Sequence, residues 1–426
     1  MDNILSERFE QSVLPNGIQV VTEAMPHAHS VALGIWVRSG PRYERESQEG
    51  ISHFVEHMLF KGTQNRTARQ INESLYPVGG HLNAFTDREF TCYTALVLRE
   101  DLSLAVEVLS DMLLNSVFAA EELEREKNVI IEEIRAIEDT PEDLVHDIFV
   151  DTIWPDHALG RPVIGRIETV ASFTRDAVLQ YVHSHYTADG ILVAAAGNLD
   201  HDYLLKELER SLGSMGGVGV LTNPSHPRAH PNTTLVYRKT EQAHLCLGMS
   251  SFQQEDADNY PMVILDTVLG GGPHSRLFDE IRENQGLAYN VGSGVMAYAE
   301  GGLFTIYASM SPRNLNKVIR IIREQLNRVT QEGLTEDEIE LARRHIRASW
   351  LLAHEGTGSR MGRIANSQLY FHRMISFEEV IRKLEAVTKD DVLRVAQKVF
   401  RRESSALAVI GPIQPTSKQA QSLRAA

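Results

Sequence analysis

The chain of 426 residues is long enough for two or three domains, and its apolar fraction of 42% is sufficient for sizeable cores. A formal charge of −15 argues against nucleic-acid binding and is compatible with basic substrates. We expect no membrane span, because no run of about 18 apolar residues occurs, and the N-terminus has no apolar signal core or Arg-rich presequence. Two cysteines, Cys92 and Cys246, exclude a disulfide framework, so we expect a cytoplasmic protein in a reducing compartment.

The first predicted elements are two strands and a helix. Strand-like runs cover Ile18–Glu23 and Val31–Arg38, and an apolar helix follows at 51–61. The pattern places Lys61 in the last helical turn and Gly62 just beyond it, which is typical of a helix end. Because apolar residues surround its polar ones, we expect this helix to be largely buried and its polar side chains to have partners.

Within this helix, His53, Glu56 and His57 form the pattern H-x-x-E-H. Histidines at i and i+4 project from one helix face, so their imidazoles can share one metal ion. Glu56 precedes the second histidine and can reach a water on that ion, which indicates metal-assisted hydrolysis with a carboxylate as general base. The alternative is a partly exposed helix face that carries His and Glu by accident.

A strand at Phe90–Leu98 and a helix at about 102–115 follow, and then a helix at Glu121–Glu138. Glu126 and Glu133 fall on the apolar stripe of that last helix, which consists of Leu123, Ile130, Ile134 and Ile137. Carboxylates facing a core need compensation, and a divalent cation would supply it.

Two His and one Glu with a position left for water fit a catalytic zinc site better than a structural one. We therefore predict His53, His57 and Glu133 as metal ligands, and Glu126 as a carboxylate that orients a ligand histidine. In the alternative interpretation, both glutamates are exposed and pair with basic neighbours on their own helix: Arg125, Lys127 and Arg135.

A returning strand is predicted at Ile191–Gly197, and the chain then repeats itself. Three pairs of segments match at one offset of 214 residues: Phe173–Leu179 with Val387–Leu393, Ala195–Gly197 with Val409–Gly411, and Phe90–Tyr93 with Phe304–Tyr307. Glycines and prolines mark a linker at 213–233 between domains 1–212 and 234–426. We predict an α+β fold of two homologous domains, each a mostly antiparallel sheet covered by helices on one face.

The second copy lacks the predicted metal residues. The same offset takes the four side chains His53, Glu56, His57 and Glu133 to Thr267, Gly270, Gly271 and Arg347. If the histidines and glutamates served folding, the second copy would need them too. Their loss favours a functional role in the first domain and predicts no metal site in the second.

The second half offers one further polar pattern. Arg282 and Tyr289 flank the end of an amphipathic helix that is predicted to stop at Gly286. Considered by itself, this pattern is typical of a surface arginine and a core tyrosine.

The assembled motifs resemble the pitrilysin/insulinase zinc metallopeptidases, or inverzincins. H-x-x-E-H is followed 76 positions after His57 by Glu133 inside E-(x)6-E, and Gly79–Thr86, Glu89–Tyr93 and His157–Pro162 are also similar to that family. The likeness extends from about residue 10 to about residue 412. It is strongest to the mitochondrial-processing-peptidase-like branch and its bacterial relatives.

The resemblance implies a zinc endopeptidase that acts on peptides or on unfolded, presequence-like segments. It implies that Glu56 is the base, that Arg282 and Tyr289 hold the substrate and its oxyanion, and that the strand at Asn83, Ala84 and Phe85 pairs with the substrate backbone. In that family four such domains enclose a chamber, and this chain supplies two, so the resemblance implies a dimer. A homodimer is the simpler version. A catalytic subunit with an inactive sibling, or a non-catalytic partner subunit, remains an alternative.

Overall fold

The computed structural model describes residues 7–219, 225–414 and 416–425. The chain forms two compact units, each built around one sheet. Unit 1 comprises residues 1–134, 162–224 and 351–378, and unit 2 comprises 135–161, 225–350 and 379–426. The linker predicted at 213–233 includes residues 220–224, which lie outside the described residues.

The sheet of unit 1 has six strands in the order β1-β2-β6-β3-β5-β4. Its strands are β1 (Phe9–Val13), β2 (Gln19–Ala24), β3 (Ser30–Val37), β4 (His81–Thr86), β5 (Thr91–Leu98) and β6 (Ile191–Gly197). All neighbours are antiparallel except β2 and β6. The central strand β6 is buried along its whole length, which is typical of a strand covered on both faces.

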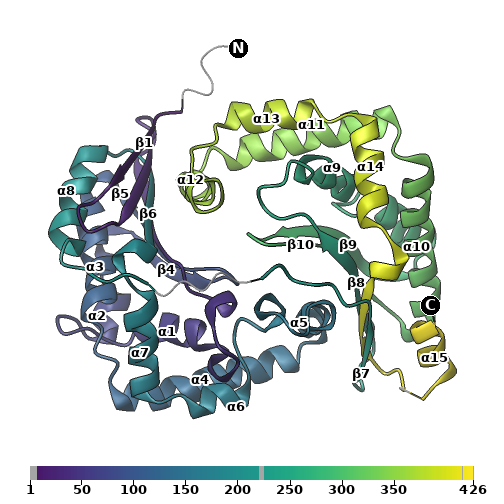
Figure 1. Ribbon diagram of the computed structural model, residues 1–426, viewed down its shortest axis with the longest axis horizontal. Coiled ribbons are helices and arrows are strands. Elements are labelled where there is room, and N and C mark those ends of the chain that lie inside the picture. Colours follow the sequence, from purple (N-terminus) through teal and green to yellow (C-terminus); the bar gives the residue numbers. More distant parts are fainter. Residues whose placement is uncertain (1–6, 220–224, 415, 426) are drawn as a thin grey trace. The chain divides into compact units, whose positions relative to one another are not determined.

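One face of this sheet packs against helices from the first half of the chain (Figure 1). These are α1 (Ile51–Leu59), α2 (Ala68–Asn72), α3 (Leu102–Asn115), α4 (Ala120–Glu138), α6 (Ile167–Ser172), α7 (Arg175–His185) and α8 (His201–Leu212). The other face is covered by a single helix, α12 (Thr357–Phe371), from the second half. Its side chains Met361, Ile364 and Ala365 pack on Trp36 and Ala194.

Unit 2 repeats this design with a five-stranded sheet in the order β7-β11-β8-β10-β9. The strands are β7 (Thr233–Tyr237), β8 (Ala243–Ser251), β9 (Ala288–Ala297), β10 (Gly302–Met310) and β11 (Ala406–Gly411), with only β7 and β11 parallel. Its helices are α9 (Asn259–Leu269), α10 (Leu315–Glu332), α11 (Glu336–Ala353), α13 (Phe377–Glu385), α14 (Lys389–Val399) and α15 (Lys418–Ala425). Helix α5 (Pro141–Ile153), from the first half, covers the opposite face.

The two units confirm the predicted fold class of two homologous, mostly antiparallel sheets with helices. The repeat offset of 214 carries α7 onto α14 and β3 onto β8 within one residue at either end. One feature differs from the prediction: the second face of each sheet is also covered, by the matching helices α12 and α5. Each covering helix comes from the half of the sequence that does not build the sheet.

The cysteines and the hydropathy of the helices can be compared with what the composition predicts. Cys92 and Cys246 are free and buried in β5 and β8. Among the described residues, no helix has the length and hydropathy that a membrane span requires.

Candidate metal centre

Helix α1 carries the H-x-x-E-H side chains, and buried contacts hold it in place. Phe54, Val55 and Met58 face the core of unit 1 and are no more than 1% exposed. At its start, the backbone N–H groups of Gly50 and Ser52 each donate to the Glu44 carboxylate at 2.8 Å. These bonds satisfy donors that a helix N-terminus otherwise leaves unpaired.

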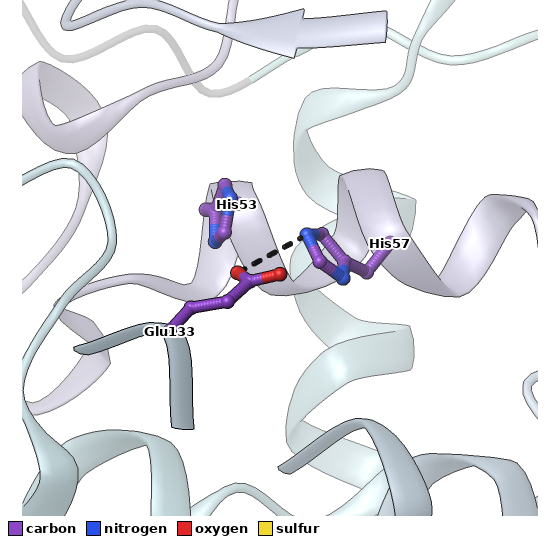
Figure 2. A group of neighbouring side chains, drawn as sticks. All are labelled: His53, His57 and Glu133. Carbon is purple, nitrogen blue, oxygen red and sulfur yellow. Dashed lines mark ion pairs between the residues drawn. The ribbon is translucent and has the colours of Figure 1, made fainter. Parts of the chain in front are cut away.

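His53, His57 and Glu133 come together. Figure 2 shows the two imidazoles projecting from one side of α1 and the Glu133 carboxylate pointing toward them from α4. One donor atom from each lies within 4.8 Å of the others, and Nε2 of His57 is 3.7 Å from Oε2 of Glu133. All three side chains are partly exposed, so solvent can reach the cluster.

The two glutamates of the apolar stripe have different surroundings. Glu126 is buried, with 3% exposure, whereas the Glu133 side chain is 42% exposed. Oε2 of Glu126 is 3.1 Å from Nδ1 of His57, and Nζ of Lys61 is 2.7 Å from Oε1. Glu126 therefore holds one ring nitrogen of His57 and leaves the other facing Glu133.

The pKa values of the two histidines are shifted in opposite directions. Burial and the charge of His57 lower the pKa of His53 to about 3, so its imidazole is neutral at ordinary pH. Burial also lowers the pKa of His57, but the hydrogen bond with Glu126 and the charges of nearby carboxylates outweigh it, and the net pKa is raised. A cation between His57 and Glu133 would replace the proton that these carboxylates favour.

Glu56 lies beside this cluster and is tied to the edge of the sheet. Oγ1 of Thr86, the last residue of β4, donates to Oε2 of Glu56 at 2.5 Å. Burial raises the pKa of Glu56, although the bond from Thr86 opposes the shift. A raised carboxyl pKa suits a group that accepts and returns a proton near neutral pH.

The predicted substrate strand is the edge strand β4. It pairs with β5 on one side and ends the strand order on the other, so one row of its backbone groups has no strand partner among the described residues. Asn83 and Phe85 are exposed and Ala84 is half-buried. Because Thr86 of this strand contacts Glu56, the edge lies next to the candidate site.

Arg282 and Tyr289 are neighbours in unit 2. Arg282 lies in a wide helical turn at Phe278–Asn284, shorter than the helix predicted to end at Gly286. Its guanidinium carbon is 5.4 Å from the Tyr289 ring centroid, and Tyr289 is 75% exposed. The interpretation of Tyr289 as a core residue is therefore wrong, because its ring lies at the surface over the arginine.

The chemistry of the cluster fits a divalent cation. Two imidazoles and a carboxylate are the donor types of open, catalytic zinc sites. Nδ1 of His53 is buried and has no hydrogen-bond partner among the described residues, so the folded chain leaves this ring partly unsatisfied. The carboxylates of Glu56, Glu126 and Glu133 give the surroundings a negative charge that only Lys61 offsets among the contacts described above.

Three contacts at the centre were not predicted from the sequence. The sequence pattern places Lys61 at a helix end, and in the structure its ammonium group also pairs with Glu126. Thr86 belongs to the predicted substrate strand, but its bond to Glu56 depends on the packing of that strand against α1, 30 residues earlier in the chain. Glu44 carried no sequence signal, because a loop carboxylate that caps a helix six residues later has no fixed pattern.

Two family models match the chain. The model described as "Insulinase (Peptidase family M16)" matches residues 19–166, and the model described as "Peptidase M16 inactive domain" matches residues 172–346. The first match includes the four residues His53, Glu56, His57 and Glu133, and the second includes Arg282 and Tyr289.

Bacterial relatives named as uncharacterized zinc proteases match nearly the whole chain. One from Streptomyces coelicolor is 41% identical over 97% of this chain and 91% of its own length. YmxG from Bacillus subtilis is 40% identical over 93% of this chain and 97% of its own length. Because these matches cover more than nine tenths of this chain, the similarity includes both halves of its sequence.

Solved structures share the fold at lower identity. A protease from Helicobacter pylori has a TM-score of 0.89 at 19% identity, covering 95% of this chain and 99% of its own. A peptidase M16 inactive domain from Pseudomonas fluorescens has a TM-score of 0.90 at 16% identity, covering 96% of this chain and 98% of its own.

Proposed function

Because the chain belongs to the pitrilysin/insulinase family of zinc peptidases, peptidase family M16, we propose that it is an active zinc endopeptidase. In this proposal His53, His57 and Glu133 hold the ion, and Glu56 is the general base. The single observation that carries the proposal is the convergence of these three donors, with Glu126 fixing the second nitrogen of His57.

In the proposed mechanism, each residue of the site has a separate role. When bound, a zinc ion acidifies a coordinated water and polarises a carbonyl. Glu56 accepts the proton from the attacking water and later delivers it to the leaving amine. Thr86 orients the Glu56 carboxylate through its hydrogen bond, and burial keeps the pKa of that carboxyl raised. Glu126 keeps the His57 ring in one orientation, as carboxylates do for ligand histidines elsewhere.

The proposed substrates are peptides or unfolded segments in an extended conformation. The free edge of β4 can pair with a substrate backbone, and main-chain pairing accepts many side chains. The exposed side chains Asn83 and Phe85 would meet alternate residues of such a substrate. Folded proteins rarely offer an unpaired extended segment, so we expect them to resist cleavage.

We further propose that Arg282 and Tyr289 stabilise the substrate and its developing oxyanion in the partner subunit of a homodimer. The observation that supports this is the exposure of Tyr289 against Arg282, which leaves both side chains available to a molecule outside unit 2. The guanidinium of Arg282 and the phenol O–H of Tyr289 are suitable hydrogen-bond donors for an oxyanion. In a heterodimer with an inactive sibling chain, the corresponding surface of the sibling would stabilise the substrate and its oxyanion.

The test is digestion of a library of unfolded peptides with the purified full-length protein. We expect cleavage that a chelator abolishes and added zinc restores. Cleavage that persists after the metal has been removed, as verified by elemental analysis, would refute the metallopeptidase proposal. A zinc-loaded protein that cleaves no peptide by itself would refute an autonomous homodimeric enzyme.

A further inference from the structure

A second feature of unit 2 has no role in the proposed peptidase. A cavity of about 430 Å³ lies between β8, helix α10, the segment at 400–405 and helix α15. This volume falls in the usual range of small-molecule sites, which is about 300–1,000 Å³. Every residue that lines the cavity belongs to unit 2.

The floor of the cavity is apolar. It is formed by side chains at most 7% exposed, from β8, α10, α15 and the residue that follows α14: Leu247, Met249, Ile319, Leu326, Leu423 and Phe400. A floor of this kind favours an aliphatic or aromatic ligand group over bulk water.

The rim of the cavity is cationic. It carries three arginines, Arg320, Arg323 and Arg402, against one carboxylate, Glu324. This excess of positive charge is local, since the chain as a whole has a net charge of −15. An anion would therefore be attracted to this rim in preference to most of the surface.

Arg323 differs from Arg320 in its surroundings. Arg320 lies 3.7 Å from Glu324, whereas the Arg323 guanidinium makes no hydrogen bond or ion pair in the part of the chain that the structure describes. Burial and the neighbouring charge of Arg402 both lower the pKa of Arg323. A half-buried guanidinium such as that of Arg323, with no ion pair among the described residues and a second guanidinium nearby, costs stability unless a ligand compensates its charge.

We propose that this cavity binds a monocarboxylate with a medium-length aliphatic chain, its carboxylate at Arg323 and Arg402 and its chain on the apolar floor. Guanidinium groups match carboxylates by paired hydrogen bonds. The cavity volume of about 430 Å³ leaves room for an aliphatic chain in addition to the carboxylate. A small inorganic anion would leave the floor unfilled.

The test is isothermal titration of the full-length protein with decanoate below its micelle concentration. We expect saturable binding of one decanoate per chain, with at least tenfold weaker binding of acetate, inorganic phosphate and 1-decanol. Binding that fails, or equal affinity for acetate, phosphate or decanol, overturns the proposal. An apolar tripeptide with a free C-terminal carboxylate that binds in place of decanoate overturns the acyl-chain assignment.

Two variants separate binding from folding. Arg323→Met keeps the apolar stem and removes the charge, so we expect decanoate affinity to fall at least tenfold. Arg328→Met is the matched control, because Arg328 lies on the same helix, pairs with Glu332 at 2.9 Å and does not line the cavity. Unchanged affinity in Arg323→Met contradicts the proposal.

The melting temperature of the unliganded variants provides a second readout. If Arg323 serves binding, Arg323→Met should melt at the wild-type temperature or above, because an uncompensated charge has been removed. If Arg323 serves the fold, the variant should melt lower, and that result would also count against the proposal.

Discussion

The Nδ1 atom of His57 lies 3.1 Å from the buried carboxylate of Glu126, and this contact determines which nitrogen of His57 faces the candidate metal position. The other nitrogen, Nε2, faces Glu133 at 3.7 Å. A ligand histidine fixed in this way needs little reordering when an ion binds. The site is therefore organised by a carboxylate that does not itself join the donor cluster.

The first prediction concerns this orienting contact. Glu126→Ala should weaken zinc affinity about 10–100-fold, because the His57 ring loses its partner. Glu126→Gln should recover part of that loss, since it keeps an acceptor oxygen. The measurement is competitive zinc titration, with Glu124→Ala as the control because Glu124 is an exposed residue of the same helix. Equal affinities in all variants would show that the contact has no influence on metal binding.

The second prediction concerns the base. Glu56→Gln should keep stoichiometric zinc but lose peptide turnover by about 10²–10⁴-fold, because the amide cannot accept the proton. Elemental analysis and peptide cleavage are measured on the same preparation. An active Glu56→Gln protein would exclude Glu56 from that role.

The third prediction concerns the ligand from α4. Glu133→Ala should reduce zinc occupancy tenfold or more, whereas Glu132→Ala, an exposed neighbour on the same helix, should retain it. Both variants should unfold at similar denaturant concentrations in the metal-free form, because Glu133 is partly exposed. Full zinc occupancy in Glu133→Ala would count against the ligand assignment.

The fourth prediction concerns action between subunits. Glu56→Gln and Arg282→Ala should each be inactive alone, and a mixture should regain part of the activity if the intact Arg282 of one chain serves the intact Glu56 of another. The measurement is peptide cleavage before and after mixing, with subunit exchange followed by native mass spectrometry. Exchange without recovery would contradict the proposed arrangement.

The fifth prediction is a pH dependence of stability in unit 2. Arg276 donates to both carboxylate oxygens of Glu338 at 2.7 Å, and the N–H and Oγ1 of Thr335 also donate to Glu338. Although burial opposes the shift, these bonds lower the pKa of Glu338 from 4.5 to about 2. The stabilisation is therefore complete above about pH 4.5 and is lost as the pH falls toward 2.

Glu338→Gln should accordingly destabilise the protein at pH 7 by about 1–2 kcal/mol, a value that allows for solvent screening of a partly exposed pair. The difference from wild type should shrink by pH 3.5. Urea unfolding at both pH values checks this, with Asp337→Asn as the control in the same helical turn. A difference that stays constant with pH would mean that ionisation of Glu338 does not contribute.

Local patterns predicted much of the fold. Alternation and apolar runs predicted β3 and β6 to within a residue at each end, and the constant offset predicted that the halves share a topology. The sequence could not predict that α12 covers the sheet of unit 1 and α5 the sheet of unit 2. An amphipathic pattern shows that a helix packs against an apolar surface, but it does not show which sheet provides that surface. The same limit applies to the arginine-lined cavity beside α10.

The candidate site was predictable where donors share one helix. His53 and His57 are four residues apart, and helical geometry alone brings them together. Glu133 and Glu126 were predicted from one apolar stripe, but only coordinates could show that Glu126 is buried and Glu133 half-exposed. The exposed pairing of Tyr289 with Arg282 could not be predicted from the sequence either, because a tyrosine at the start of a strand, here β9, can face the core or the surface.

The most direct test of the account is a crystal structure of the zinc-loaded protein, with anomalous scattering recorded at the zinc edge. The account predicts one strong peak per chain, bonded at about 2.0–2.2 Å to His53, His57 and Glu133, with one further coordination position open to solvent. A peak at another group of residues, or no peak in protein that still cleaves peptides, would contradict it.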